Sequence, residues 1–150
     1  MAPFDDIAQP TLQFALKVEI NVDDPVVISS GPRGARYLYP ILGGTFEGAD
    51  EDFHGEIISP SADLAVGHSD GLGISLNVHV AMRNHDGATM LGMVQGRFEL
   101  DPNNPANGKQ HSSLTFETGD ERFKWMNNKV SVGYGKKEGK TIRLNGYKVV

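Results

Sequence analysis

Two long stretches of the chain alternate apolar and polar residues, which is the pattern of β-strands with two unlike faces. Residues 12–20 carry apolar side chains at every second position, and residues 72–83 do the same. In the second stretch Leu, Ile, Val and Met form one face, and the other carries Ser, Asn, His and Arg. An Asp-Gly pair at 86–87 then leads into a further strand pattern at 88–100. These features together predict a long β-hairpin.

Shorter strand patterns fill most of the remaining chain, and turn-forming Gly, Pro, Asn and Asp residues separate them. The segments concerned are 26–28, 36–42, 44–47, 53–59, 62–67, 111–118, 129–134 and 140–149. We expect residues 101–108 to be a loop and residues 120–126 to form one helical turn. Eight to ten antiparallel strands with local connections predict one all-β domain over residues 1–150, with its core at about 12–149. Such a sheet closes as a barrel or folds as a sandwich.

The composition agrees with this fold class and narrows the function. Gly contributes 18 residues and Pro 8, which suits strands joined by tight turns. The net charge is −5 and no basic cluster stands out, which argues against nucleic acid or an anionic membrane as a partner. The absence of Cys excludes disulfides and a thiol nucleophile. The sequence shows neither a signal-peptide pattern nor a long apolar run, so we expect a cytoplasmic protein.

No motif of high specificity marks a nucleotide, phosphate or metal site, and the sequence predicts neither a metal nor a cofactor. His79 is the first catalytic candidate, because it lies in mid-strand beside Asn77 on the polar face. A neutral imidazole can exchange a proton near pH 7, and the Asn77 amide can donate to a developing oxyanion. Glu47 and Glu117 are candidate proton carriers, since burial between aromatic and small neighbours would raise their pKa values. Exposure to solvent is the alternative for each of these residues.

Aromatic residues supply the candidate ligand contacts. Residues 116–127 hold two of the seven Phe and the only Trp, so this segment either plugs one end of a barrel or forms a ligand platform. We expect the walls of a ligand cavity to include aromatic rings, and Arg83 to orient a substrate or stabilise negative charge on it. The predicted ligand-binding residues are Tyr37, Tyr39, Phe46, Arg83 and Trp125.

Several short motifs resemble a known family when they are taken together and in order. They are residues 43–48 (Gly-Gly-Thr-Phe-Glu-Gly), Gly55-Glu56, Ala62-Asp63, Asp70-Gly71, Asp86-Gly87 and the segment 116–127. From residue 12 to 149 the chain resembles the domain of unknown function 3237, a family of small bacterial and fungal proteins. The resemblance implies an antiparallel β-barrel with a central cavity, similar in broad architecture to calycin and allene oxide cyclase barrels.

The same resemblance bears on the polar face of residues 72–83. In a barrel with a ligand cavity this face would line the lumen, and the aliphatic face would pack outside. Relatives tend to carry Asp and Arg on the strand where this chain has Asn77 and His79, which implies an altered ligand or chemistry here. We therefore expect the polar face to point inward.

Three functions fit these observations. The favoured one is a cofactor-independent isomerase, cyclase or lyase that acts on a mostly apolar, oxygenated small molecule of secondary metabolism. The alternative is a barrel that binds such a molecule without converting it. The third is an interaction protein whose aliphatic outer face is buried in a homodimer or larger homo-oligomer. That face would consist of Leu76, Val78 and Val80.

Overall fold

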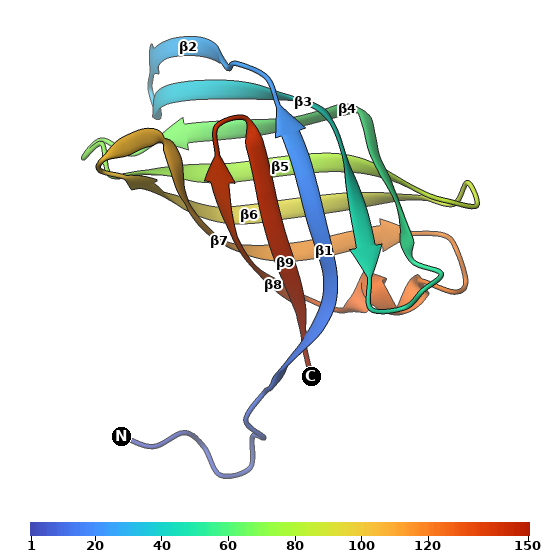
Figure 1. The fold of residues 1–150 in the computed structure, drawn as a ribbon. Helices are drawn as coiled ribbons and strands as arrows, with labels where there is room; N and C mark the ends of the chain where they lie inside the picture. The colour runs from blue at the N-terminus through green and yellow to red at the C-terminus, as the bar shows by residue number, and fades with distance from the viewer.

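The computed structural model describes the backbone of residues 1–150 and every side chain except those of Ser29 and Ser30. The described chain forms nine β-strands and one short 3-10 helix (Figure 1). The elements are β1 (Leu12–Val22), β2 (Val26–Gly31), β3 (Gly34–Gly48), β4 (His54–Gly67), β5 (Gly73–Asn84), β6 (Thr89–Asp101), β7 (Asn104–Thr118), η1 (Lys124–Asn128), β8 (Ser131–Glu138) and β9 (Thr141–Val149). No helix among the described residues has the length and hydropathy needed to cross a membrane.

Eight of the strands close into an antiparallel barrel, which confirms the predicted fold class. Their order around the barrel is β1-β9-β8-β7-β6-β5-β4-β3, and pairing of β1 with β3 completes the ring. The remaining strand, β2, pairs with the first half of β3 and extends the sheet beyond the barrel (Figure 1). Closure gives the eight barrel strands a partner on both sides and so removes the exposed sheet edges that promote aggregation.

The junction between β1 and β3 depends on a close backbone approach at Gly44. This residue is the register partner of Ile20, and a Cβ atom built on Gly44 would lie 2.0 Å from the backbone oxygen of Glu19. No carbon and oxygen atoms can approach so closely without a bond. Gly44 therefore lets the two strands meet where the barrel closes.

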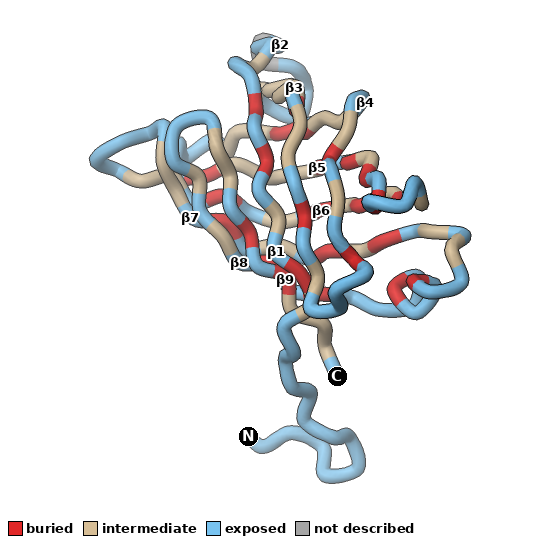
Figure 2. Tube along the Cα trace, turned by 45° about the vertical axis from the view of Figure 1, so that its right-hand side comes forward, coloured by how far each residue is buried: buried red, intermediate tan, exposed pale blue. Residues whose placement is uncertain are grey.

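Buried and exposed residues alternate along the barrel strands (Figure 2). The inward side chains form one hydrophobic core, in which Phe46, Leu16, Met82 and Leu114 are almost fully buried. One end of the barrel is closed by aromatic rings beside η1. The Phe53 ring lies 4.9 Å from that of Phe46 and 5.1 Å from that of Phe123, as measured between ring centroids. The segment 116–127 thus closes this end of the barrel with the buried ring of Phe123, as one of the two sequence interpretations expected.

The two faces of strand β5 are oriented opposite to the sequence prediction. The aliphatic face points inward, and Val78, Val80 and Met82 are buried. The polar face points to solvent, with His79 and Arg83 exposed. Because burial of apolar surface is the main driving force of folding, the aliphatic side fills the interior, and the prediction that the polar face lines the lumen is wrong. The aliphatic face of Leu76, Val78 and Val80 is therefore inside the barrel and not on the outer surface, and the homodimer remains a prediction.

Two local predictions differ from the structure. Residues 101–108 were expected to form a loop, but β6 extends to Asp101 and β7 begins at Asn104. The reversal is short because Oδ1 of Asp101 accepts a hydrogen bond from the backbone N–H of Asn103 at 2.9 Å, which stabilises a tight turn. The helical turn expected at 120–126 lies slightly later, at η1.

Candidate functional site

The barrel encloses a cavity of about 70 Å³ at the end opposite η1. The residues around it come from the last part of β1, β6 and β8, the first part of β5, β7 and β9, the middle of β3 and the later half of β4. Aliphatic side chains and Phe98 form most of the wall. Four polar residues interrupt this wall: Tyr39, Asp63, Gln110 and Lys137. An apolar pocket with a few polar groups is the usual form of a small-molecule site.

Asp63 is the most unusual residue of this cavity. It lies on β4 between its register partners Tyr39 of β3 and Val78 of β5, and only 8% of its surface is exposed. Among the side chains that the structure describes, it is the one buried ionisable group. Its Oδ1 accepts a hydrogen bond from the backbone N–H of Asn77 at 3.0 Å.

The surroundings of Asp63 change its protonation. Burial raises the pKa of the carboxyl group to about 6, although the hydrogen bond from the Asn77 N–H acts in the opposite direction. The carboxyl group therefore titrates close to neutral pH inside an apolar cavity. A group in this state can both accept and return a proton, which is the property required of a general acid–base catalyst.

Tyr39 places a phenol beside this carboxyl group. Burial raises the pKa of Tyr39, and the neighbouring Asp63 and Tyr37 raise it further. The phenol thus stays protonated at neutral pH and can donate a hydrogen bond. The ring of Tyr37 lies 6.4 Å from that of Tyr39 between centroids, on the same face of β3. Of the predicted ligand contacts, Tyr39 is the one that lines the cavity.

The other polar groups of the wall come from β7 and β8. Gln110 of β7 is buried, and its Nε2 lies 3.3 Å from Oγ of Ser112, to which it donates a hydrogen bond. Lys137 of β8 is half-buried, and its Nζ lies 5.6 Å from the centroid of the Tyr39 ring. Burial lowers the pKa of Lys137, while the carboxylate of Asp24 opposes this effect. The cavity therefore combines a carboxyl, a phenol, an amide and an amine.

Strand β4 inverts the usual hydrophobic pattern at this point. Asp63 faces the interior, whereas the neighbouring Leu64 is 48% exposed on the outside. A carboxyl group inside and a leucine outside both cost stability, and natural proteins accept such conflicts mainly at functional sites. The register of β4 against β5 shifts by two residues between Ile58 and Ala62, so Asp63 keeps the inward orientation of Ile57. The apolar Ile58 and Leu64 stand on the opposite face, so hydrophobicity alone does not reveal which side chains of β4 point inward. The Ala62-Asp63 pair, one of the family motifs, was the available signal.

The structure brings Asn77 and His79 together, but on the outer surface. Nε2 of His79 lies 3.3 Å from Oδ1 of Asn77, within hydrogen-bond distance, and His79 is exposed. The backbone of Asn77 reaches the site through its N–H, whereas the side chain faces away from the cavity. Arg83 and Glu117 are also exposed, on β5 and β7.

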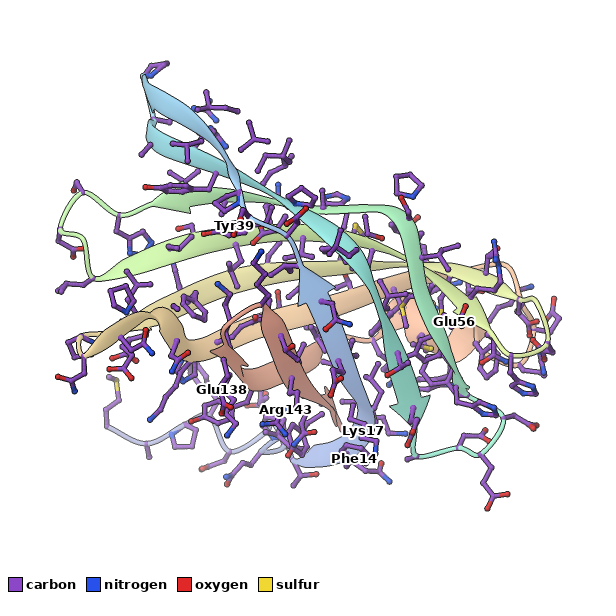
Figure 3. All side chains as sticks on the ribbon, turned by 45° about the horizontal axis from the view of Figure 1, so that its top comes forward. Phe14, Lys17, Tyr39, Glu56, Glu138 and Arg143 are labelled. Atoms are coloured by element: carbon purple, nitrogen blue, oxygen red, sulfur yellow. The ribbon has the colours of Figure 1, made fainter. Side chains whose placement is uncertain are left out.

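The remaining predicted residues lie away from the cavity as well. Glu47 forms an exposed ion pair with Lys17, with 3.0 Å between the charged atoms, and Figure 3 shows Lys17 well apart from Tyr39. Phe46 belongs to the core at the closed end. Trp125 lies on η1 with 43% of its surface exposed, and Nζ of Lys148 stands 4.9 Å from the centre of its ring. These residues do not converge on one enclosed volume.

The fold defines a small antiparallel β-barrel with an internal, mostly apolar cavity. The chain belongs to the family described as protein of unknown function (DUF3237), which matches residues 10–149. This membership confirms the family resemblance seen in the sequence motifs.

Individual relatives share the fold over nearly the whole chain. A UPF0311 protein of Clostridium acetobutylicum is 26% identical over 161 residues, which cover 96% of this chain and 97% of the relative. A β-barrel-like protein from Acinetobacter baumannii is 21% identical, with a TM-score of 0.86 over 98% of this chain and all of that one. A structure described as an enzyme from Penicillium herquei is 17% identical, with a TM-score of 0.69 over 99% and 100% of the two chains. At these identities the two solved structures show the fold alone.

Proposed function

We propose that the protein is an acid–base enzyme, an isomerase, cyclase or lyase, that acts on a mostly apolar, oxygenated small molecule in the barrel cavity. The observation that carries this proposal is Asp63, a buried carboxyl group with a pKa of about 6 in an otherwise apolar wall. A non-catalytic carrier can orient its ligand with neutral polar groups, whereas a carboxyl group that titrates near neutral pH matches the need of an acid–base catalyst. The site residues are accordingly Asp63 and Tyr39 rather than the residues on the outer surface.

The two residues would have complementary roles. The carboxylate of Asp63 accepts a proton from a carbon or hydroxyl group next to a carbonyl of the substrate. The Tyr39 phenol donates a hydrogen bond to the carbonyl oxygen, where negative charge develops. The proton then returns from Asp63 to another atom of the substrate, so that the product is an isomer or a closed ring. Because the proton leaves and returns, this step consumes no oxidant or reductant.

The size of the cavity restricts how a substrate would bind. Its volume of about 70 Å³ is small beside the roughly 300–1,000 Å³ of pockets that hold drug-sized ligands. The enclosed part therefore accommodates the reactive end of a substrate. The rest would lie at the mouth, near the turns that connect β4 to β5, β6 to β7 and β8 to β9. Exclusion of water from the enclosed end strengthens the polar interactions there.

The structural neighbour from Penicillium herquei supports the catalytic proposal in one limited respect. It is described as an enzyme, so a barrel of this fold can carry catalysis. Its identity of 17% transfers neither its substrate nor its residues to this chain.

Proton transfer can be measured with simple ketones before the natural substrate is known. The protein is incubated in D2O with cyclohex-3-enone and a series of apolar ketones, and double-bond isomerisation and α-deuteration are followed by proton NMR. We expect Asp63→Asn to lower the rate about 100- to 10,000-fold and Tyr39→Phe to lower it less. Glu56→Gln removes an exposed carboxylate from the same strand and is expected to leave the rate unchanged.

Two results would count against the proposal. An equal rate for the wild-type protein and Asp63→Asn would remove Asp63 from the reaction. Binding of the ketones without any reaction above that of buffer would favour the carrier function instead. A change in ketone binding alone, at an unchanged rate constant in the bound complex, would also assign the cavity to binding.

A further inference from the structure

Lys137 differs from the other lysines beside the β8–β9 turn. Lys136 forms an ion pair with Glu138 at 2.9 Å, and Lys140 lies 3.3 Å from the carboxylate of Asp24. Both of these pairs are on the surface. Lys137 instead lines the cavity, and no ion pair among the described residues includes it. No carboxylate lies within ion-pair distance of its ammonium group, although the charge of Asp24 acts on it from farther away.

The position of this ammonium group is at the mouth of the barrel. Lys137 is the register partner of Gly108 and Ile142, close to the ends of β7, β8 and β9. Its Nζ lies 5.6 Å from the centroid of the Tyr39 ring on β3, and two strands, β9 and β1, separate β8 from β3 around the barrel. The side chain therefore extends across the mouth of the barrel from β8 toward β3.

A half-buried ammonium group without an ion-pair partner is costly, because it loses hydration that the distant carboxylate of Asp24 replaces only in part. A cation–π interaction with the face of the Tyr39 ring offsets only part of this loss. A negatively charged oxygen of a ligand would restore the missing interaction and would do so at the point where the apolar wall ends. The apolar interior and the single cation at its rim thus form the two halves of a site for an amphipathic anion.

We propose that the ligand of the cavity is an apolar acid. Its one carboxylate or phenolate group pairs with Lys137, and its apolar body lies inside the barrel. This inference rests on the proposed function and names its substrate class. Lys137 is the one cationic residue among the described residues of the wall, and Asp63 contributes a negative charge when ionised. A ligand of higher negative charge, such as a phosphate monoester, would be repelled, since a single ammonium group cannot balance it.

Binding of matched acids and amides tests this inference. The probes are 3-phenylpropanoate, octanoate and 2-naphthoate, each with its amide of the same shape, and affinities are measured by calorimetry or by NMR titration at pH 7.5. We expect the wild-type protein to prefer the acid by about ten-fold or more in at least one pair. Lys137→Met and Lys137→Gln should lose this preference, whereas Lys137→Arg should keep most of it.

A neighbouring lysine and a backbone amide provide the controls. Lys136→Met removes an equal charge from the outer surface and should keep the preference for the acid. Binding in the cavity should shift the backbone amide signal of Asn77, which is hydrogen bonded to Asp63. The inference is overturned if no pair shows a preference for the acid, whether both members bind alike or neither binds. It is also overturned if Lys137→Met keeps the preference, or if Lys136→Met loses it equally.

The outcomes of the binding test and the ketone test are independent of each other. A preference for the acid that depends on Lys137, together with no reaction that depends on Asp63, would leave the anion site standing and remove the catalytic role. The opposite combination would keep the proton-transfer function and reject the acidic substrate. Asp63→Asn should preserve or increase affinity for the acids, because it removes a negative charge from the same cavity.

Discussion

Asp63 and Tyr39 are register partners on adjacent strands, and both side chains line the internal cavity of the barrel. Their proximity affects the protonation of the phenol, because the negative charge of Asp63 helps to raise the pKa of Tyr39. The pair therefore offers a proton acceptor and a hydrogen-bond donor at neutral pH within one apolar space. The pairing of the consecutive strands β3 and β4 sets this relationship, and the other strands of the barrel enclose the pair in the cavity.

Asp63→Asn is expected to change the pH dependence of stability. Burial raises the pKa of Asp63 from 3.8 to about 6, so the folded protein binds this proton more tightly than the unfolded chain does. The resulting stability is fully present below about pH 3.8 and is lost as the pH rises through 6. Relative to Asp63→Asn, the wild-type protein should therefore lose up to about 3 kcal/mol between pH 4 and pH 7.

Urea unfolding of both proteins at several pH values between 4 and 7 measures this difference. Comparison with the variant cancels the other titrating groups, and the Asn side chain can still accept the hydrogen bond from the Asn77 N–H. A constant difference in the free energy of unfolding across this range would show that Asp63 has an ordinary pKa.

Phe123→Ala should destabilise the barrel through its closed end. Phe123 is 2% exposed and packs against Phe53, so its truncation leaves a cavity that the rigid strands cannot fill. We expect a loss of about 3–5 kcal/mol in the free energy of unfolding, measured with urea. Trp125→Ala, two residues further on in η1 but 43% exposed, should cost clearly less. Equal losses for the two variants would contradict the role of Phe123 as the plug.

Gly44→Ala should weaken the closure of the barrel. The new Cβ atom would meet the backbone oxygen of Glu19, so β1 and β3 must move apart. The expected cost is about 1–3 kcal/mol or more, with faster hydrogen exchange in β1 and β3. Gly119→Ala is the control, because a Cβ atom there meets nothing within 4 Å. Unchanged exchange in Gly44→Ala would show that the junction adapts without strain.

Arg122 connects two carboxylates from separate turns, and its loss should lower stability at neutral pH. It forms ion pairs with Asp86 and Asp120 and lowers the pKa of both groups. This stabilisation is present above the ordinary pKa of aspartate and is lost as the pH falls below about 4. We expect Arg122→Met to lower the Tm by a few degrees at pH 7 and by less at pH 3.

The matched control for this prediction is Lys124→Met. Lys124 forms an exposed ion pair with Glu121 within the same segment and connects no separate turns. Its removal should change the Tm little at either pH, since exposed pairs contribute little to stability. A pH-independent effect of Arg122→Met would indicate that packing, rather than the two carboxylates, accounts for its contribution.

The β5–β6 hairpin shows how far the sequence pattern could lead. Alternation over residues 72–83 and the Asp86-Gly87 pair predicted both strands and their turn. The structure agrees, because Gly87 has a φ of 95° and Oδ1 of Asp86 accepts a hydrogen bond from the N–H of Ala88. Alternation shows that the two faces of the strand differ, but it does not show which face points into the barrel, that of His79 or that of Val78. The assumption of a polar lumen selected the wrong face.

The site itself was harder to predict than the strands. Tyr39 was identified because aromatic residues are natural cavity walls, but Asp63 was not, since Leu64 beside it is a stronger core residue. Asp63 lies on the inward face of β4 with Ile57 and Ala65, and Leu64 lies on the outer face, so the most apolar positions of this strand do not mark its buried side. Lys137 similarly lies in a run of charged residues at a turn, and its different surroundings follow from the three-dimensional course of β8. Both residues depend on contacts between distant segments.

The most direct test of the site is an NMR titration of the Asp63 carboxyl group, with Asp63→Asn used to assign its carbon signal. We expect a pKa of about 6, as burial in the cavity requires. We also expect that addition of an acid that binds at Lys137 changes this pKa, because a charge then enters the same cavity. A pKa near 4 that does not respond to any such acid would contradict a functional site at Asp63.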